Sequence, residues 1–165
     1  MMRQRSREWY PTGSMDWQKS SEVSKRDNLY ATQDGKPAAF RFDEQVVAVF
    51  PDMINRSVPG YALIVPMIGQ LARRYVQPDS IVHDLGSSLG AVCLSVQHGL
   101  QGRQDLGETQ IIATDNSPAM VRRFNELLEA HQPGATNLVP ITSRLADVRE
   151  VEIINASLVV LNFTL

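Results

Sequence analysis

This sequence has few of the residues that build disulfides and metal centres. Its single cysteine, Cys93, excludes a disulfide within the chain and fits a reducing compartment. Because Cys93 lies in the apolar string AVCLSV, we interpret it as a buried structural thiol rather than a nucleophile. The three histidines are His83, His98 and His131, and they show no spacing typical of zinc ligands, so we expect no metal.

Long apolar runs and a strong charge of one sign are also missing. No stretch of about 18 apolar residues occurs, so the sequence predicts no membrane-spanning helix. The basic residues near the N-terminus are not followed by an apolar segment, so the pattern is not that of a secretory signal. The net charge of -2 argues against the basic face that direct nucleic-acid binding needs. We therefore expect a cytoplasmic protein.

The sequence does contain enough apolar side chains for one folded domain. Hydrophobic residues make up 43% of the 165 residues. Residues 1–38 are polar and show no sustained period, which predicts a flexible polar N-terminal arm. Met15 offers a second translation start within this arm. Residues 39–165 are expected to form the folded part.

Two helices are expected before residue 80. Asp43 is placed to cap a short helix over FDEQVVAVF, which Pro51 is expected to stop or redirect. Residues 57–76 carry apolar side chains at three- and four-residue steps, which predicts an amphipathic helix. Pro66 lies inside that range and predicts a kink or a break.

From residue 80 the pattern changes to alternating strands and helices. Short apolar runs predict strands at 81–85, 110–115, 137–142 and 156–163. Helices are expected at 88–99 and from Pro118, where Ser117 is placed as the N-cap. This alternation, with strands apolar on both faces, predicts a parallel sheet covered by helices. The last strand has the pattern of a central one, so we expect a sheet truncated after its fourth strand.

The stretch SIVHDLGSSLGAV joins the first of these strands to a helix. Ligands of open α/β sheets bind beyond the carboxyl ends of the strands, usually at such a turn. Gly86 and Gly90 allow close backbone approach, and the helix start near Ser88 offers unpaired N–H groups. Because Ser88 stands where the dinucleotide fingerprint has glycine, a pyrophosphate ligand is disfavoured. Alone, the turn fits a ligand site and a structural connection equally well.

Polar residues follow the other strands as well. Asp115 closes the second strand, where a carboxylate accepts hydrogen bonds from ribose, and Asn116 is placed to bond a base. The alternative is that both only cap the next helix, a role that Ser117 already fills. Asp147 follows the third strand, where it would meet an adenine amino group unless it is a solvated loop acid. Asn162 ends the fourth strand.

This order of residues resembles the class I S-adenosylmethionine-dependent methyltransferase fold, a Rossmann-like parallel sheet. Longer strings narrow the resemblance. From about Arg26 to Leu165 the sequence resembles the carboxy-S-adenosyl-L-methionine synthase family, in the strings FDEQVVAVFPDMINRSVPGY, DLGSSLGAVCLSV, DNSPAM and NASLVVLNFTL. Residues 39–165 would then be the N-terminal part of a domain that binds S-adenosylmethionine.

The resemblance also implies an activity. The family converts its substrates S-adenosylmethionine and prephenate to carboxy-S-adenosylmethionine and phenylpyruvate, without a metal, for the 5-oxyacetyluridine modification of the tRNA wobble position. Its members are homodimers. Its contacts to S-adenosylmethionine fall here on Tyr61, Gly86, Ser87, Ser88, Asp115, Asn116, Asp147, Val148 and Asn162. No side chain stands out as a general base, so the catalytic residue stays unknown.

Two features of the family are expected beyond Leu165. They are the arginine that holds the substrate carboxylate and the elements that form the dimer. Two alternatives therefore stay open. One is a truncated, non-catalytic remnant that binds S-adenosylmethionine or pairs with a protein through its open sheet edge. The other is an S-adenosylmethionine-dependent methyltransferase that acts on a small molecule or tRNA, although the pairs Arg73–Arg74 and Arg122–Arg123 fit solvated helix faces better.

Overall fold

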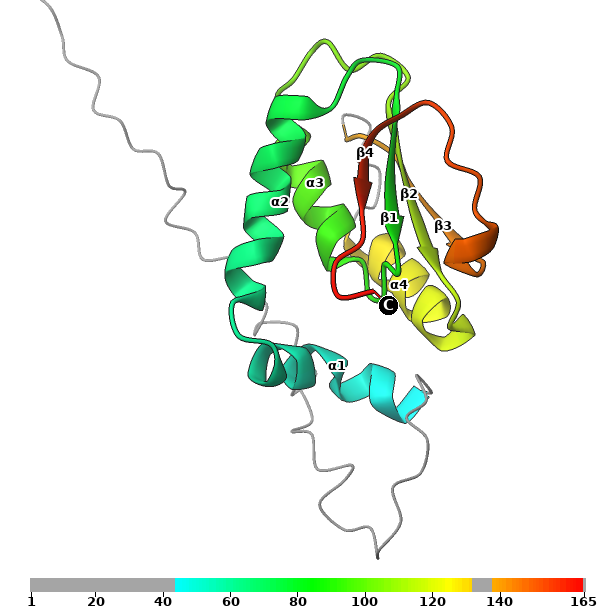
Figure 1. Ribbon diagram of the computed structural model, residues 1–165. Coiled ribbons are helices and arrows are strands. Elements are labelled where there is room, and N and C mark those ends of the chain that lie inside the picture. Colours follow the sequence, from blue (N-terminus) through cyan, green and yellow to red (C-terminus); the bar gives the residue numbers. More distant parts are fainter. Residues whose placement is uncertain (1–43, 132–137, 165) are drawn as a thin grey trace, which may run out of the picture.

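The computed structural model describes residues 44–131 and 138–164. Its centre is a four-stranded sheet in the order β3-β2-β1-β4, with all neighbouring strands parallel (Figure 1). The strands are β1 (Ile81–Leu85), β2 (Gln110–Asp115), β3 (Ile141–Leu145) and β4 (Ala156–Val160). The predicted parallel sheet is confirmed. The arm predicted at residues 1–38 and the cap predicted at Asp43 lie outside the described residues.

The direction in which strands are added reverses between β1 and β4. Along the chain, β2 and β3 are added on one side of β1, whereas β4 returns to its other side and places Val160 opposite Asp84. In open α/β sheets, ligands bind outside the carboxyl ends of the strands at such a reversal. The topology therefore directs attention to the carboxyl ends of β1 and β4.

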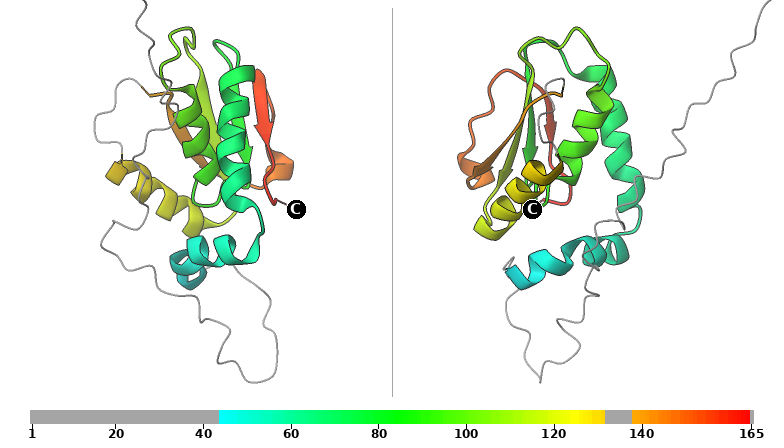
Figure 2. Two further views of the ribbon diagram at one scale, coloured as in Figure 1. Left: turned by 90° about the vertical axis from the view of Figure 1, so that its left-hand side faces the viewer. Right: turned by 180° about the vertical axis from the view of Figure 1, so that it is seen from behind.

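Three helices lie on the same side of the sheet, as Figure 2 shows. They are α2 (Tyr61–Tyr75), α3 (Ala91–Leu100) and α4 (Pro118–His131). Their apolar side chains form one buried core with the strands, which includes Val82, Cys93, Val96, Ile111 and Phe124. Cys93 is buried, as predicted.

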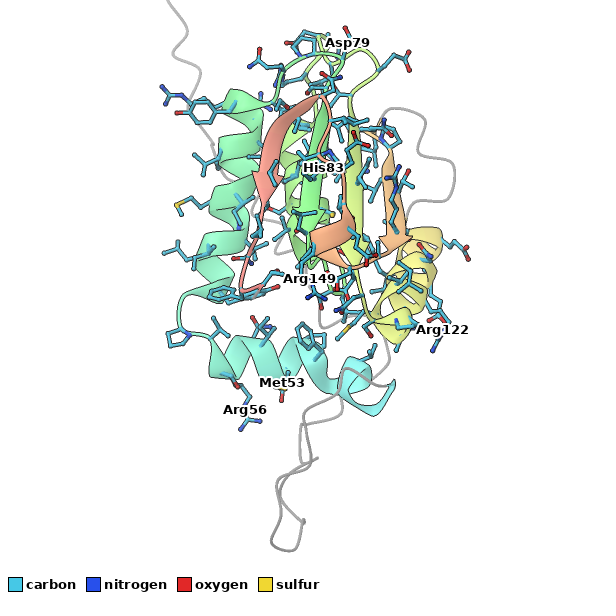
Figure 3. The ribbon with its side chains drawn as sticks, turned by 45° about the vertical axis from the view of Figure 1, so that its right-hand side comes forward. Met53, Arg56, Asp79, His83, Arg122 and Arg149 are labelled. Atoms are coloured by element: carbon cyan, nitrogen blue, oxygen red, sulfur yellow. The ribbon has the colours of Figure 1, made fainter. Side chains whose placement is uncertain are left out.

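The connection between β3 and β4 lies on the side of the sheet away from these three helices (Figure 2). It contains the short helix η1 (Val148–Glu150). His83 is buried within β1, and its Nε2 lies 3.4 Å from the carbonyl oxygen of Ile154 in this connection (Figure 3). All five residues of β1 are buried, as expected for a central parallel strand.

Helix α1 (Glu44–Ser57) lies across the carboxyl edge of the sheet (Figure 1). The prediction that Pro51 stops this helix is wrong, because the helix continues for a further six residues to Ser57. Apolar residues on both sides of the proline, Phe50 before it and Ile54 after it, pack in one cluster with Met120 of α4. Burial of the apolar side chains on both sides of Pro51 outweighs the backbone hydrogen bond that is lost because proline has no N–H.

Helix α2 runs unbroken through Pro66, so the break predicted there is absent. Val65 and Ile68, on either side of the proline, pack against the core, whereas Pro66 itself faces solvent. The predicted apolar stripe is only partly buried. Ala72 lies in the core, but Tyr75 at the end of the helix is exposed.

Two further boundaries differ from the prediction. Helix α3 begins at Ala91 rather than at 88, because Ser88 and Gly90 have φ values of 50° and 76°, which do not fit a right-handed helix. Strand β3 spans Ile141–Leu145 rather than 137–142: it begins directly after Pro140, which has no N–H for the ladder, and continues past 142 in register with β2. Residue 137 lies outside the described residues. None of the described helices is long and apolar enough to cross a membrane.

Candidate functional site at the carboxyl edge of the sheet

Hydrogen bonds tie the turn after β1 to the end of β2. The N–H groups of Gly86 and Ser87 both donate to the carbonyl oxygen of Thr114, at 2.8 and 2.9 Å. The Ser88 N–H donates to Oδ2 of Asp115 at 2.8 Å. The expectation of an unpaired N–H at Ser88 is therefore wrong. These hydrogen bonds to the end of β2 fix the conformation of the turn without a ligand.

Gly86 and Gly90 are required by space as well as by backbone conformation. Their φ values are 82° and 76°, in the left-handed region that favours glycine. A Cβ on Gly86 would overlap Thr164, and a Cβ on Gly90 would overlap the ring of Phe124. The turn is thus packed between the segment after β4 and helix α4.

Asp84 is a buried carboxylate beneath this turn. Its side chain is 2% exposed, and its Oδ2 accepts a hydrogen bond from the Cys93 thiol at 3.1 Å. Burial raises the pKa of Asp84 to about 6; the charge of Asp115 raises it too, and the Cys93 hydrogen bond opposes the rise. Sequence reasoning did not select Asp84, although a charged residue inside an apolar strand was the available signal. A cation placed nearby would favour its ionised form.

Asp115 has a structural part in the site. While its Oδ2 holds Ser88, its Oδ1 accepts a hydrogen bond from the Ser117 N–H at 2.8 Å. Ser117 in turn accepts the Met120 N–H at 3.3 Å, which confirms it as the N-cap of α4. Each carboxylate oxygen has a second acceptor position, so the ribose contact predicted for Asp115 is compatible with these bonds. Asn116, the next residue, is exposed.

Asp147 lies at the same edge, beyond β3. The preceding Ala146 donates its N–H to the carbonyl oxygen of Asp115 at 3.1 Å, which joins the ends of β2 and β3. The Asp147 carboxylate accepts hydrogen bonds from the N–H and the Nε of Arg149, both at 2.9 Å. This pairing lowers the pKa of Asp147 to about 2. Figure 3 shows Arg149 near the ends of the strands, and Val148 begins η1 between the two partners.

The chain turns back onto β1 after β4. This strand ends at Val160 rather than at 163 as predicted, and Phe163 has a φ of 57°, outside the extended conformation. Thr164 then donates its hydroxyl to the carbonyl oxygen of Leu85 at 2.8 Å. Asn162, the predicted contact residue, is half-buried at the start of this return.

Tyr61, the first residue of α2, meets that returning segment. The centres of the Tyr61 and Phe163 rings are 6.1 Å apart, with the rings tilted by 37°. Burial raises the pKa of Tyr61, and the charge of Asp84 raises it further. Tyr61, Phe163 and Asp84 therefore form one neighbourhood at the end of β1. Phe163 was not predicted as a site residue, because its position depends on the turn after β4.

The nine predicted contact residues thus lie at the carboxyl ends of the four strands or on the start of α2 beside them. Hydrogen bonds join the turn after β1 to β2, and β2 to β3, while the segment after β4 bonds to the end of β1. In the described part of the chain, no three potential metal ligands lie together. The arrangement offers carboxylates, an amide and aromatic rings around a turn that Thr164 covers at Gly86.

Two curated proteins are similar in sequence to this chain. The chain is 51% identical over 143 residues to the carboxy-S-adenosyl-L-methionine synthase of Erwinia tasmaniensis, which covers 87% of this chain and 55% of that enzyme. The enzyme of the same name from Geobacter sp. strain M21 is 51% identical over 142 residues, with 86% and 55% covered. The chain is therefore similar in sequence to the carboxy-S-adenosyl-L-methionine synthases. It spans about half the length of the curated relatives that it matches.

The fold of the chain also has a counterpart among solved structures. A Methanococcus maripaludis protein, named provisionally as an S-adenosyl-L-methionine-dependent methyltransferase, matches with a TM-score of 0.51. The two are 19% identical, and the match covers 76% of this chain and 52% of that one, so the likeness concerns the fold alone. The predicted class I methyltransferase fold is confirmed. No protein-family model matches the chain.

Proposed function

We propose that this chain binds S-adenosylmethionine at the carboxyl edge of its sheet and, within a carboxy-S-adenosyl-L-methionine synthase, carboxylates it with prephenate. The observation that carries the proposal is the turn Gly86–Ser88, placed at the strand-order reversal above the buried carboxylate of Asp84. The 51% identity to enzymes of that name supports it. Because the chain covers 55% of those relatives, the activity is proposed for the whole protein.

The residues at this edge suit successive parts of the ligand. The turn at Gly86, Ser87 and Ser88 lies at this edge, and we assign the amino-acid part to the side of the turn that Thr164 does not cover. The free lone pairs of Asp115 suit the ribose hydroxyls. Asp147, which is ionised at neutral pH, suits the adenine amino group. Of the four remaining predicted contacts, Asn116 and Val148 lie beside these two carboxylates, and Tyr61 and Asn162 lie by the end of β1 and β4.

The chemistry belongs largely to the bound substrate. S-adenosylmethionine supplies a sulfonium whose attached methyl group is acidified. The residues of this chain hold that group in place and keep water and competing acceptors away from it. No described side chain is placed as a general base, so we assign no catalytic residue. Release of phenylpyruvate, use of the product in tRNA modification, a cytoplasmic location and a homodimeric enzyme are parts of the same proposal.

Two measurements test the proposal. Calorimetric titration of the purified chain with S-adenosylmethionine is expected to give one saturable site. Mass spectrometry of a reaction with S-adenosylmethionine and prephenate is expected to detect the carboxylated product, with the Erwinia tasmaniensis enzyme as the positive control. Absence of binding would overturn the assignment of the site. Binding without product, when the control is active, would support the non-catalytic alternative.

A third outcome would favour a different reaction. If S-adenosylhomocysteine accumulates in the presence of tRNA and without prephenate, the chain transfers a methyl group. Incubation with tRNA alone, prephenate alone and both together separates the two activities. The carboxylation proposal expects carboxy-S-adenosylmethionine only where prephenate is present, and no methyl transfer to tRNA.

A further inference from the structure

Phe163 is an aromatic side chain that is left exposed in an unfavourable backbone conformation. Its side chain is 56% exposed, and its φ of 57° lies in the left-handed region. This conformation costs free energy for a bulky residue, and such residues concentrate at functional sites. Phe163 belongs to neither buried apolar cluster of the described residues, so core packing does not explain its conformation.

The neighbouring residue holds Phe163 in place. The hydroxyl of Thr164 donates to the carbonyl oxygen of Leu85 at 2.8 Å, and Thr164 fills the space above Gly86. This contact anchors the segment at the carboxyl end of β1 and positions the Phe163 ring 6.1 Å from the Tyr61 ring. Two aromatic side chains from distant parts of the sequence are thereby brought together beside the turn.

Negative charge lies close to this ring pair. Asp84 is buried at the end of β1; burial raises the pKa of Tyr61, and the charge of Asp84 raises it further. The faces of aromatic rings are also regions of negative potential. A carboxylate and two rings that share one small region favour a cation over a neutral group. The proposed ligand carries two cations, the α-ammonium of its amino-acid part and the sulfonium. The ammonium has N–H donors and suits hydrogen-bond acceptors, whereas the sulfonium has none and suits the faces of aromatic rings.

We propose that Phe163 and Tyr61 form an aromatic pair that contacts the sulfonium cation of S-adenosylmethionine. This inference rests on the proposed function and adds a ligand-contacting residue, Phe163, to it. It predicts that the pair discriminates by charge. S-adenosylhomocysteine has the same adenosine and amino-acid parts but a neutral thioether, so it forgoes the cation–π attraction.

The test compares both ligands on the same variants by calorimetric titration. Phe163→Leu keeps an apolar side chain of similar size and removes the ring. We expect the Kd for S-adenosylmethionine to rise by roughly five- to thirtyfold, while the Kd for S-adenosylhomocysteine changes by less than about twofold. Phe163→Trp keeps a ring and is expected to retain the preference for the cation. Tyr75→Leu, which removes an exposed ring at the far end of α2, is the matched control and should change neither Kd.

The outcomes separate this inference from the proposed function. An equal loss of affinity for both ligands in Phe163→Leu would overturn the sulfonium contact, because the ring would then serve only the parts that the ligands share. An unchanged affinity for both would overturn it as well. If the unaltered protein binds neither ligand, the proposed function itself fails. Should Phe163→Leu lose its thermal transition, Tyr61→Leu provides the same comparison of the two ligands from the other ring.

Discussion

Asp84 and Asp115 lie at the ends of adjacent strands, and their surroundings give them different tasks. Asp84 is almost fully buried, with a thiol as its hydrogen-bond partner, and its pKa is raised to about 6. Asp115 is half-buried and accepts two backbone N–H groups that fix the turn and the start of α4. One carboxylate therefore responds to pH and to nearby charge, whereas the other supports the shape of the site.

The first prediction at the residue scale concerns the pH dependence of stability. Because the Asp84 pKa rises from 3.8 to about 6 on folding, the folded state keeps its proton to higher pH than the unfolded state. The resulting stabilisation is complete below about pH 4 and is lost as the pH rises through 6. It amounts to on the order of 3 kcal/mol. Urea unfolding of the wild type and of Asp84→Asn at several pH values measures it.

The free energies of unfolding of these two proteins should diverge with pH. Between pH 4 and pH 7 we expect the free energy of unfolding of the wild type to fall relative to that of Asp84→Asn, because the amide does not ionise. Asp105→Asn is the control: Asp105 is exposed beside Arg103, and this pairing lowers its pKa, so any effect has the opposite sign. Parallel curves for wild type and Asp84→Asn would show that Asp84 does not titrate in this range.

A second prediction at this scale separates ligand contact from structural support. Asp115→Ala removes the acceptor of two backbone N–H groups, so we expect it to lower both the Tm and the affinity for S-adenosylmethionine. Asn116→Ala changes an exposed side chain and should leave the Tm within about 1 °C. It should raise the Kd by roughly two- to tenfold through one lost hydrogen bond. An unchanged Kd in the folded Asn116→Ala protein would remove Asn116 from the site.

At the scale of elements, α2 and α3 cross through small residues. Gly69 of α2 lies against Ser95 of α3, and Gly99 of α3 lies against the backbone of Gly69. A Cβ on Gly69 would lie 2.5 Å from the carbonyl oxygen of Ser95. Ser95 also donates its hydroxyl to the carbonyl oxygen of Val65 at 2.8 Å. This close crossing positions α2, and with it Tyr61, relative to the turn before α3.

We therefore predict that Gly69→Ala forces the two helices apart. The added methyl meets backbone atoms that cannot rotate away, so we expect a loss of roughly 1–3 kcal/mol in the free energy of unfolding. Urea denaturation followed by circular dichroism measures the loss. Gln70→Ala, one residue further on the exposed side of α2, is the matched control and should leave the midpoint unchanged. A Gly69→Ala protein as stable as the control would show that the crossing of α2 and α3 accommodates a methyl group at this position.

At the scale of the whole molecule, β4 is an edge strand among the described residues. It pairs only with β1, and its neighbourhood exposes apolar side chains that include Val159 at 41% and Leu161 at 58%. An unpaired edge with apolar side chains is a template for association. The other edge strand, β3, pairs only with β2 and exposes Leu145 at 56%, but the segment after β4 adds further exposed apolar side chains to the β4 edge.

We predict that this edge governs the solubility of the isolated chain. Leu161→Lys places a charge beside the edge and should lower self-association, measured by light scattering at increasing concentration, without lowering the Tm by more than about 2 °C. Leu63→Lys introduces the same charge on the exposed side of α2 and serves as the comparison. If Leu63→Lys lowers self-association and Leu161→Lys does not, α2 rather than the β4 edge is the associating surface.

Local patterns in the sequence were sufficient for much of the fold. The bounds of β1 and β2 agree with their predicted ranges, and Ser117 caps α4 as expected, because these features depend on neighbouring residues only. Both early helices were predicted, but the continuation of α1 through Pro51 and of α2 through Pro66 was not. Their continuity depends on packing against residues that lie far away in the chain. The ligand contacts of the nine site residues remain predictions.

The sequence by itself determined the alternation of strands and helices, the glycines of the turn and the similarity to the carboxy-S-adenosyl-L-methionine synthases. These depend on residue order and on short-range conformational preferences. Only the tertiary structure decided that Asp84 is buried and that its pKa is therefore raised. It also decided that Asp115 supports the turn and that Phe163 lies beside Tyr61. Burial and long-range contact arise when segments distant in the chain pack together, and no local pattern encodes them.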